Sequence, residues 1–175
     1  MSLGEPIGAD EVLQAVNFLA LLRPDPANEV NLPTFALLRS MAPRVSTAIV
    51  RDLVKGSDCR ERLIGQALAV LQGPENFVDD LVASLRDPRG ISIVPCAAAL
   101  VLAARRKGGR DLPESTAMLR RDMFDGEIGW AIDKARSRLG AIPDPDPDPE
   151  STGPNYSQSL DQHLLFFAWL RGEAS

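Results

Sequence analysis

Proline occupies every second position from Pro143 to Pro149. Because proline has a fixed φ and no backbone N–H, this stretch cannot continue a helix or take a central place in a sheet. It therefore predicts a break in the chain, with a helical domain over residues 1–140, an acidic proline-rich linker over 141–157 and a C-terminal amphipathic aromatic helix over 158–175. Alternating prolines favour an extended polyproline conformation, so we expect the linker to act as a spacer.

The charge of the chain lies in its last thirty-five residues. Residues 141–175 hold six acids and one base, whereas residues 1–140 hold eighteen of each, so the formal net charge of -5 belongs to the tail. The sequence pI is about 4.9. A nucleic-acid-binding domain is normally basic, at least along one stripe, so this balance argues against nucleic acid as a partner.

Composition predicts an all-α fold. Hydrophobic residues make up 45% of the chain and aromatic residues 5%, with Ala, Leu and Arg dominating. These side chains lose little freedom in a helix, and no alternating strand pattern bounded by hairpin turns occurs. At 175 residues the chain can bury a core without disulfides or metal ions. We expect a single domain of seven or eight helices.

Apolar spacing, prolines and glycines place the individual helices. The expected helices cover 10–23, 33–41, 45–54, 58–71, 74–85, 92–104, 113–124, 128–139 and, beyond the linker, 160–170. Asp58 and Glu61 form a capping-box pattern at the start of one of them. The run Ile91–Ala104 is apolar nearly all round but shorter than the roughly 20 residues of a membrane span, so it predicts a central buried helix.

A weak internal repeat appears at an offset of thirty-two residues. It pairs Val50 with Val82, Leu53 with Leu85, and Ala67-Leu68 with Ala99-Leu100. With an Asp-Pro turn at Asp87-Pro88 and an Ala-rich second helix, residues 50–104 resemble short bacterial HEAT-like repeats. The resemblance implies a right-handed stack of helix pairs. The alternative is an irregular helical bundle.

The C-terminal helix is too apolar to stand in water. Its predicted partner-binding residues are Leu164, Phe166, Phe167, Trp169 and Leu170. Burial of each such side chain contributes about 1.5 to 3 kcal/mol, so we expect the helix to dock. It can dock on its own domain, exchange between protomers or enter a partner's groove. This pattern predicts a non-catalytic protein–protein interaction or adaptor module, with a protein partner or self-association.

Ser159 and Gln162 form a second capping-box pattern, which predicts that this last helix begins close to Ser159.

A basic cluster follows the central helix and consists of Arg105, Arg106, Lys107 and Arg110. One interpretation is phosphate binding, as in a nucleic-acid-associated regulator. Another is that the cluster receives the acidic linker, so that the tail folds back onto the domain electrostatically. The neutral domain and acidic tail favour the second interpretation.

An enzyme is the alternative functional class, and it would use carboxylates and Arg residues in a surface cleft. The candidate carboxylates are Glu75, Asp79, Asp80, Asp122, Asp125 and Glu127. Their spacing places them away from the apolar helix faces, which is typical of a solvated surface. His163 is the only histidine, so a Cys59 or Cys96 nucleophile would have to use it as a base. We expect no catalytic residues.

Metal and cofactor signatures are absent from the sequence. Asp144, Asp146 and Asp148 match the first positions of a calcium loop, but Pro149 stands where that loop needs glycine and Asn155 where it needs glutamate. No glycine-rich phosphate loop occurs. We therefore predict no cofactor and no metal.

The two cysteines lie far apart, and the N-terminus has no basic patch followed by an apolar core. Both features favour the cytoplasm, without a membrane anchor. Sixteen of the nineteen basic residues are Arg, a usage typical of GC-rich bacterial genomes.

Overall fold

The computed structural model describes residues 5–87, 90–106, 126–140, 142–143 and 154–173. Within these residues the chain is helical and forms no strand, which confirms the all-α prediction; one isolated β-bridge joins Ile7 and Val45. The α-helices are α1 (Ala9–Ala15), α2 (Leu19–Leu22), α3 (Leu32–Met41), α4 (Thr47–Val54), α5 (Cys59–Gln72), α6 (Val78–Arg86), α7 (Ile93–Arg106), α9 (Gly126–Arg138) and α10 (Pro154–Leu170). The predicted helix over 113–124 lies outside the described residues.

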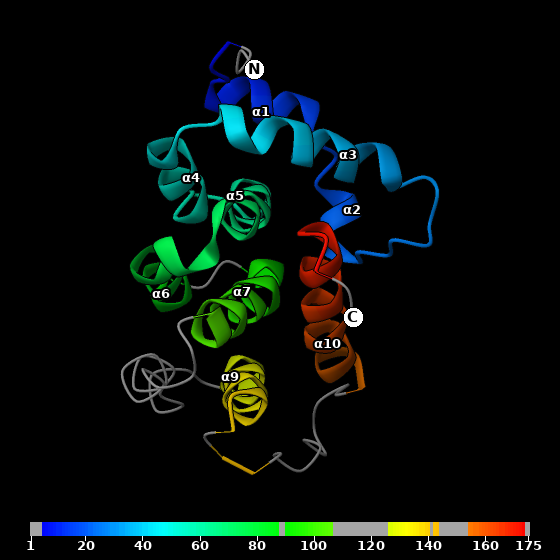
Figure 1. Cartoon of the computed structure of the whole chain (residues 1–175). Coiled ribbons are helices and arrows are strands. Elements are labelled where there is room, and N and C mark those ends of the chain that lie inside the picture. The colour runs from blue at the N-terminus through cyan, green and yellow to red at the C-terminus, as the bar shows by residue number, and fades with distance from the viewer. Residues whose placement is uncertain (1–4, 88–89, 107–125, 141, 144–153, 174–175) are drawn as a thin grey trace.

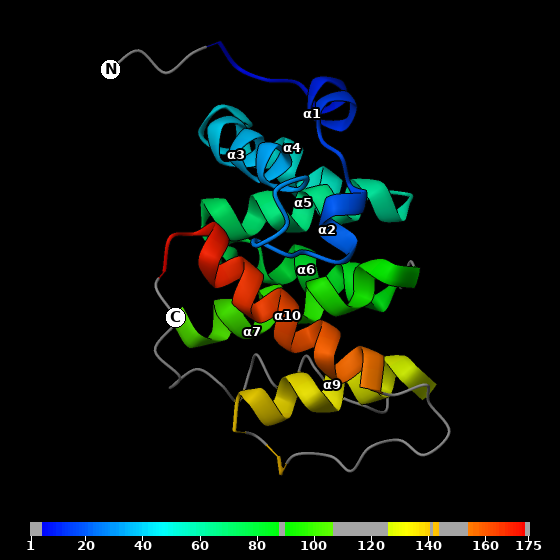
Figure 2. The same ribbon diagram turned by 90° about the vertical axis from the view of Figure 1, so that its right-hand side faces the viewer.

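Helices α5, α7 and α9 form a row through the middle of the molecule, and Figure 1 views them nearly end-on. Helices α4 and α6 lie on one side of this row, where α4 packs against α5 and α6 against α7. Helix α10 lies on the opposite side, across the row, as Figure 2 shows. Helices α1 and α3 cover the α5 end of the row. The molecule is therefore layered, with α10 as a layer of its own.

Helix α7 is the centre of the core. Its residues Val94–Ala104 are all buried, as the apolar sequence predicts for a helix surrounded by others. It contacts α5, α6, α9 and α10. Five of these eleven side chains are alanines, whose small size lets neighbouring helices approach closely. Helix α7 therefore connects three layers: α4 and α6 on one side, the row of α5, α7 and α9 in the middle, and α10 on the other side.

Local sequence signals start and end α5. The predicted capping box is present, because the Asp58 side chain accepts from the Glu61 N–H and the Glu61 carboxylate accepts from the Asp58 N–H. Gly73 ends the helix with a φ of 105°, a left-handed conformation that glycine adopts without steric cost. Inside the helix, a Cβ on Gly65 would lie only 2.5 Å from the Val54 nitrogen of α4. The α4–α5 contact therefore needs glycine at this position.

The N-terminal helix predicted over 10–23 is wrong as a continuous element. It is interrupted between Ala15 and Leu19, where the Asn17 Oδ1 atom accepts a hydrogen bond from the Leu19 N–H at 3.2 Å. Asparagine side chains commonly compete with the helix for backbone amides in this way. The expected 74–85 helix is likewise divided into a short 3₁₀ turn, Pro74–Asn76, followed by α6.

The expected start of the last helix is also wrong. Helix α10 begins at Pro154, so Ser159 lies inside it and forms no capping box with Gln162. Proline suits the first turn of a helix because the N–H that it lacks would have no helical partner there. The helix therefore includes residues 154–157 of the predicted linker, while residues 141 and 144–153 lie outside the described part of the chain.

Candidate docking site of the C-terminal helix

One face of α10 is buried against the rest of the chain. Phe166 and Phe167 are only 1% and 2% exposed, and Leu160, Leu164 and Leu170 are buried with them. These positions recur at the three- and four-residue spacing of one helix face. Leu165, on the outer face, is 62% exposed. The predicted docking of the helix therefore takes place on the chain's own helices, mainly α7.

Phe35 of α3 anchors an aromatic cluster with the end of α10. Its ring centroid lies 4.7 Å from that of Phe166 and 5.6 Å from that of Trp169, with tilted and edge-on planes. Phe166 also contacts Phe167 at 5.5 Å. Such pairs contribute about 0.5 to 1.5 kcal/mol beyond the area they bury. The cluster places α3 and α10 in direct contact, although 131 residues separate Phe35 from Phe166 in the sequence.

Arg39 of α3 binds the carboxyl end of α10. Its Nε donates to the Leu170 carbonyl at 2.8 Å and its Nη2 to the Trp169 carbonyl at 2.7 Å. The guanidinium also lies 4.2 Å from the centroid of the Trp169 ring. The last carbonyls of a helix have no partner within it and carry partial negative charge, so a cation is favourable there. Arg39 thus recognises a helix that ends at this point.

The end of α10 has the geometry of a Schellman motif. The Glu173 N–H donates to the Ala168 carbonyl and the Gly172 N–H to that of Trp169, both at 2.9 Å. Gly172 has a φ of 73°, which this motif requires and glycine permits. Arg171 then donates from Nη1 to the Val70 carbonyl near the end of α5. The residues that follow α10 therefore bind it to α5 as well as to α3.

Glu173, the last described residue, joins the tail to the end of α7. Its Oε1 lies 2.8 Å from Arg106 Nη1 and 2.6 Å from Arg171 Nε. Arg106 Nε lies 3.1 Å from Glu75 Oε2, an ion pair outside hydrogen-bond geometry. All four side chains of these pairs are at least partly exposed, so each pair contributes little to stability on its own. Together they place an acid of the tail beside the predicted basic cluster.

The middle of α10 is bound to α9. The Arg138 guanidinium, at the end of α9, donates through Nε and Nη2 to the two carboxylate oxygens of Asp161 at 2.9 and 2.8 Å. This bidentate arrangement is the most favourable geometry for an arginine–carboxylate pair. It also shows that the carboxyl end of α9 lies beside the middle of α10.

His163 lies in the contact between α10 and α2. Its Nδ1 is 2.7 Å from the Ser159 carbonyl and its Nε2 is 3.1 Å from that of Leu21. A neutral imidazole has one N–H and can donate to only one of them. Burial lowers the pKa of His163 below its ordinary value, although hydrogen bonds to both carbonyls act in the opposite direction. The ring is therefore a neutral packing group of the interface.

We call the body residues that hold α10 the α10 seat. They are Leu21, Phe35, Arg39, Val70, Arg106 and Arg138. They come from α2, α3, α5, α7 and α9, so five helices meet around one.

The sequence-predicted partner-binding residues all lie in this contact. Leu164, Phe166, Phe167 and Leu170 are buried in it, and Trp169 is partly buried. They face the chain's own body and so offer no free surface while α10 is docked. Binding of an external partner by these side chains stays a prediction, and it requires α10 to leave the seat.

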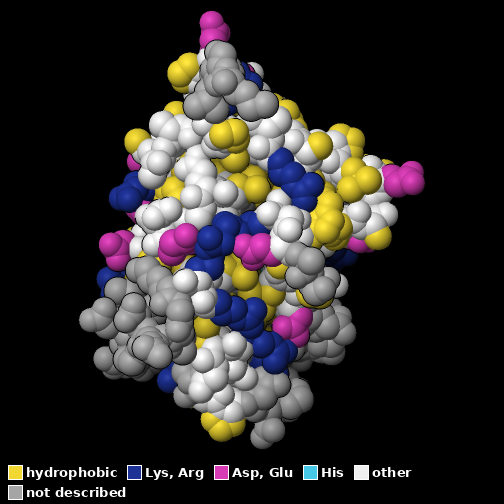
Figure 3. All heavy atoms as spheres, viewed as in Figure 1, with side chains coloured by type: hydrophobic (Ala, Val, Ile, Leu, Met, Phe, Trp, Pro, Cys, Tyr) yellow, Lys and Arg dark blue, Asp and Glu magenta, His cyan; other side chains and the backbone are white. Residues whose placement is uncertain are grey.

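The predicted basic cluster is only partly within the described residues, because Lys107 and Arg110 lie outside them. Arg105 donates to the Arg138 carbonyl at 3.4 Å, and Arg106 pairs with Glu75 and Glu173. Figure 3 views the face at which α5, α7 and α9 end, and basic side chains follow one another down it with acidic ones beside them. The arginines of this face neutralise helix ends and carboxylates of the same chain.

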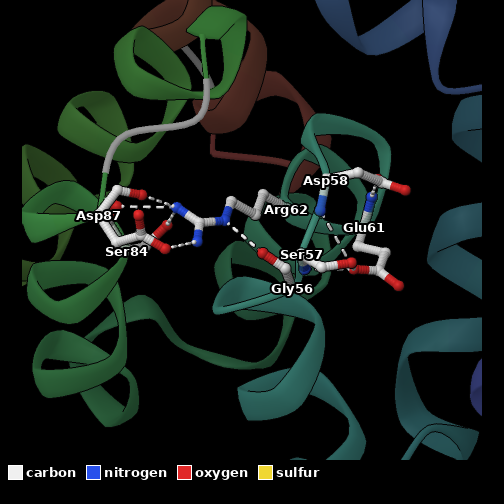
Figure 4. Close-up of polar contacts among 7 residues, drawn as sticks. All are labelled: Gly56, Ser57, Asp58, Glu61, Arg62, Ser84 and Asp87. Atoms are coloured by element: carbon white, nitrogen blue, oxygen red, sulfur yellow. Dashed lines mark hydrogen bonds and ion pairs between the residues drawn. The ribbon is translucent and has the colours of Figure 1, made fainter.

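Arg62 is the most deeply buried charged group of the described residues, at 2% exposure. Figure 4 shows its guanidinium between the α4–α5 turn and the end of α6. It donates to the Gly56 carbonyl at 2.7 Å, the Ser84 carbonyl at 2.9 Å and the Asp87 carbonyl, and it pairs with the Asp87 carboxylate at 3.0 Å. These contacts join α5 to the turn before it and to the end of α6, so Arg62 is a structural group.

Cys96 and His163, considered as a nucleophile and its base, are not brought together. Burial raises the pKa of the Cys96 thiol to about 12, and its Sγ donates to the Leu81 carbonyl at 3.2 Å, whereas His163 contacts Leu21 and Ser159. Asp80, expected on the outer surface, is 7% exposed and forms an ion pair with Lys55 Nζ at 2.9 Å. Arg51 of α4 also lies near this carboxylate, with its Nε 3.7 Å from Asp80 Oδ2, so two cations compensate the burial of the charge. Asp122 and Asp125 lie outside the described residues.

The described residues contain no group of three or more His, Cys, Asp or Glu side chains that could hold a metal ion. In the same part of the chain, no helix has the length and apolar character to cross a bilayer. Comparison with known protein families, curated proteins and solved structures finds no match to this chain.

Sequence reasoning found the apolar face of α10 but missed most of the α10 seat. Arg39 lies 130 residues before Trp169, and nothing in its local sequence distinguishes it from other surface arginines. Arg171 had a signal, because a cation directly after the last apolar residue of a helix favours its carboxyl end. Gly172 had one as well, since glycine is the usual residue of a Schellman motif.

Proposed function

We propose that this chain is a non-catalytic protein-interaction module and that the α10 seat binds an amphipathic helix. In the structure α10 itself fills the seat. The observation that carries the proposal is the form of this contact, since a single helix at the end of a proline-rich segment inserts its apolar face among five helices of the body. Helix-in-groove contacts of this kind are a common mode of protein recognition.

A HEAT-like stack is the architecture that we propose for the body. Two observations support it: α4 packs on α5 and α6 on α7, and the second helices of these pairs continue into a row with α9. The starts of α5, α7 and α9 at Cys59, Ile93 and Gly126 are spaced 34 and 33 residues apart, close to the sequence repeat. Stacks of this kind bind partners on an extended concave face, and we propose that the row of second helices forms that face here. Helix α10 occupies the corresponding face here.

The cytoplasm of a GC-rich bacterium is the setting that we propose. The free thiols of Cys59 and Cys96 and the high share of Arg among the basic residues support it.

A peptide titration tests the proposal. The full chain with Phe167→Asp should release its own α10, because a carboxylate cannot enter the apolar contact without a large desolvation cost. A fluorescent peptide of residues 154–173 is then added, and its anisotropy is followed. We expect saturable binding to the variant and much weaker binding to the unmodified chain, whose seat is filled. A peptide carrying the same Phe167→Asp change is the control and should not bind.

Hydrogen exchange of the unmodified chain gives a second test that needs no variant. If the seat is a binding site, α10 must open without unfolding of the body, so its amides should exchange at a lower free energy than those of α5 and α7. Equal opening free energies for α10 and α7 would show that α10 is an inseparable part of the core. Together with absent peptide binding, that result would refute the module.

A further inference from the structure

The contact between Arg138 and Asp161 limits how far the linker must reach within one chain. Arg138 is the last residue of α9, and its guanidinium lies 2.8 Å from the Asp161 carboxylate. Asp161 is seven residues after Pro154, so the start of α10 lies roughly 10 Å further along the helix axis. With the length of the arginine side chain included, the segment 139–153 needs to span only roughly 10 to 20 Å.

The same segment is far longer than this requirement. Leu139 and Gly140 still belong to the turn that ends α9, but the thirteen residues 141–153 alone would cover roughly 40 Å at about 3.1 Å each in a polyproline conformation. Its alternating prolines favour that extended form, and its four acids, Asp144, Asp146, Asp148 and Glu150, repel one another along the chain. A linker of this composition favours separation of its two ends, whereas docking within one chain requires them to lie close together.

Nothing in the contact itself requires both partners to belong to one chain. The contacts of α10 run from its own side chains and carbonyls to Leu21, Phe35, Arg39, Val70 and residues of α7 and α9. The tail of a second copy carries the same groups in the same order. It would therefore make every one of these contacts in an empty seat.

We propose that α10 is exchanged between two copies of this chain, so that the helix of each copy occupies the α10 seat of the other. The inference rests on the proposed function and names the partner as a second copy. Exchange of an identical element costs little, because the helix makes the same interactions in the seat of the second copy as in its own. The composition of the linker favours the exchange, since alternating prolines and like charges disfavour a close approach of its two ends and so lower the effective concentration of α10 at its own seat.

A complementation experiment tests the exchange with full-length chains. Arg39→Glu impairs the seat, because its carboxylate would face the carbonyl end of α10, but leaves the tail intact. Phe167→Asp impairs the tail and leaves the seat intact. When the two variants are mixed, the intact tail of the first can dock only in the intact seat of the second. Native mass spectrometry should then show a one-to-one heterodimer of twice 18.9 kDa, and Phe167→Asp alone should remain monomeric.

The linker provides a matched control. Replacing residues 144–150 by alternating Gly and Ser of the same length removes the prolines and the acids but keeps the length of the linker. Because a short flexible linker gives an effective concentration in the millimolar range, we expect the midpoint concentration of dimer formation to rise about tenfold or more. Sedimentation velocity over a concentration series measures this shift. An unchanged midpoint would overturn the role assigned to the linker.

Two outcomes separate this inference from the proposed function. If the unmodified chain sediments as a monomer over the whole concentration series while the 154–173 peptide binds the Phe167→Asp variant, exchange between copies is refuted and the module stands. If neither heterodimer nor peptide binding occurs, both are refuted.

Discussion

His163 shows how burial at one residue couples the docking of α10 to pH. Burial lowers the pKa of its imidazole in the folded chain below the value of about 6.5 that it has when unfolded. The unfolded chain therefore binds the proton more strongly. The contribution of neutral His163 to stability is complete above pH 6.5 and is lost as pH falls from there through the folded pKa.

We expect the free energy of unfolding in urea to fall between pH 7.5 and pH 5.5. His163 is the only histidine, so the effect has one source in the upper part of this range. The His163→Gln variant, which has no imidazole, should lack the slope, whatever its stability at pH 7.5. Equal slopes for the two proteins would contradict the prediction.

Arg62 is a residue whose loss should be costly. Its replacement by Met keeps an unbranched side chain of similar length but removes the donors to the carbonyls of Gly56, Ser84 and Asp87. A buried acceptor left without a partner costs about 1 to 3 kcal/mol, so we expect a loss of about 3 kcal/mol or more. Arg86→Met on the exposed surface is the control and should change stability by less than about 0.5 kcal/mol. Urea unfolding of both variants measures the difference.

At the scale of elements, Gly65 decides how closely α4 and α5 pack. Alanine has the better helix propensity by about 1 kcal/mol, so propensity alone predicts that Gly65→Ala stabilises α5. The structure predicts the opposite sign, because the new methyl group would lie 2.5 Å from Val54 N and 2.6 Å from Leu53 C. Backbone atoms cannot move aside without displacing α4, and such overpacking costs about 1 to 3 kcal/mol. A higher midpoint of thermal unfolding in the variant would contradict this expectation.

Elements with a local signal were predictable from sequence. Asp58, Glu61 and Gly73 bound α5 through contacts within a few residues, and the apolar run of α7 needs no partner to be recognised. Elements whose bounds depend on competition between side-chain and helical hydrogen bonds were less predictable. Asn17 interrupts the predicted first helix by taking an amide from it.

At the scale of the whole molecule, the direction of each apolar face was predictable but not its partner. The spacing of Phe166, Phe167 and Leu170 shows that α10 must bury one side, yet it does not say which helices cover it. The choice of seat depends on Phe35 and Arg39, more than 120 residues away, and on the order in which helices stack. Contacts at that separation leave no periodic pattern in a single sequence.

In the layered arrangement α10 covers apolar side chains of the core, yet it is a single helix that the chain could release. Truncation after Pro143 tests whether the body folds without it. The deletion uncovers apolar side chains of α7 and removes Phe166, Phe167 and Leu170. Burial of each such side chain contributes about 1.5 to 3 kcal/mol, part of which is offset by the entropy of ordering the tail. We expect a loss of about 3 kcal/mol in urea unfolding, together with binding of a hydrophobic dye to the uncovered seat. Helical circular dichroism should fall only by the share of α10, because α4 to α7 retain their contacts with one another. Loss of all helical signal would show that the layers fold as one unit, and unchanged stability without dye binding would show that α10 covers nothing.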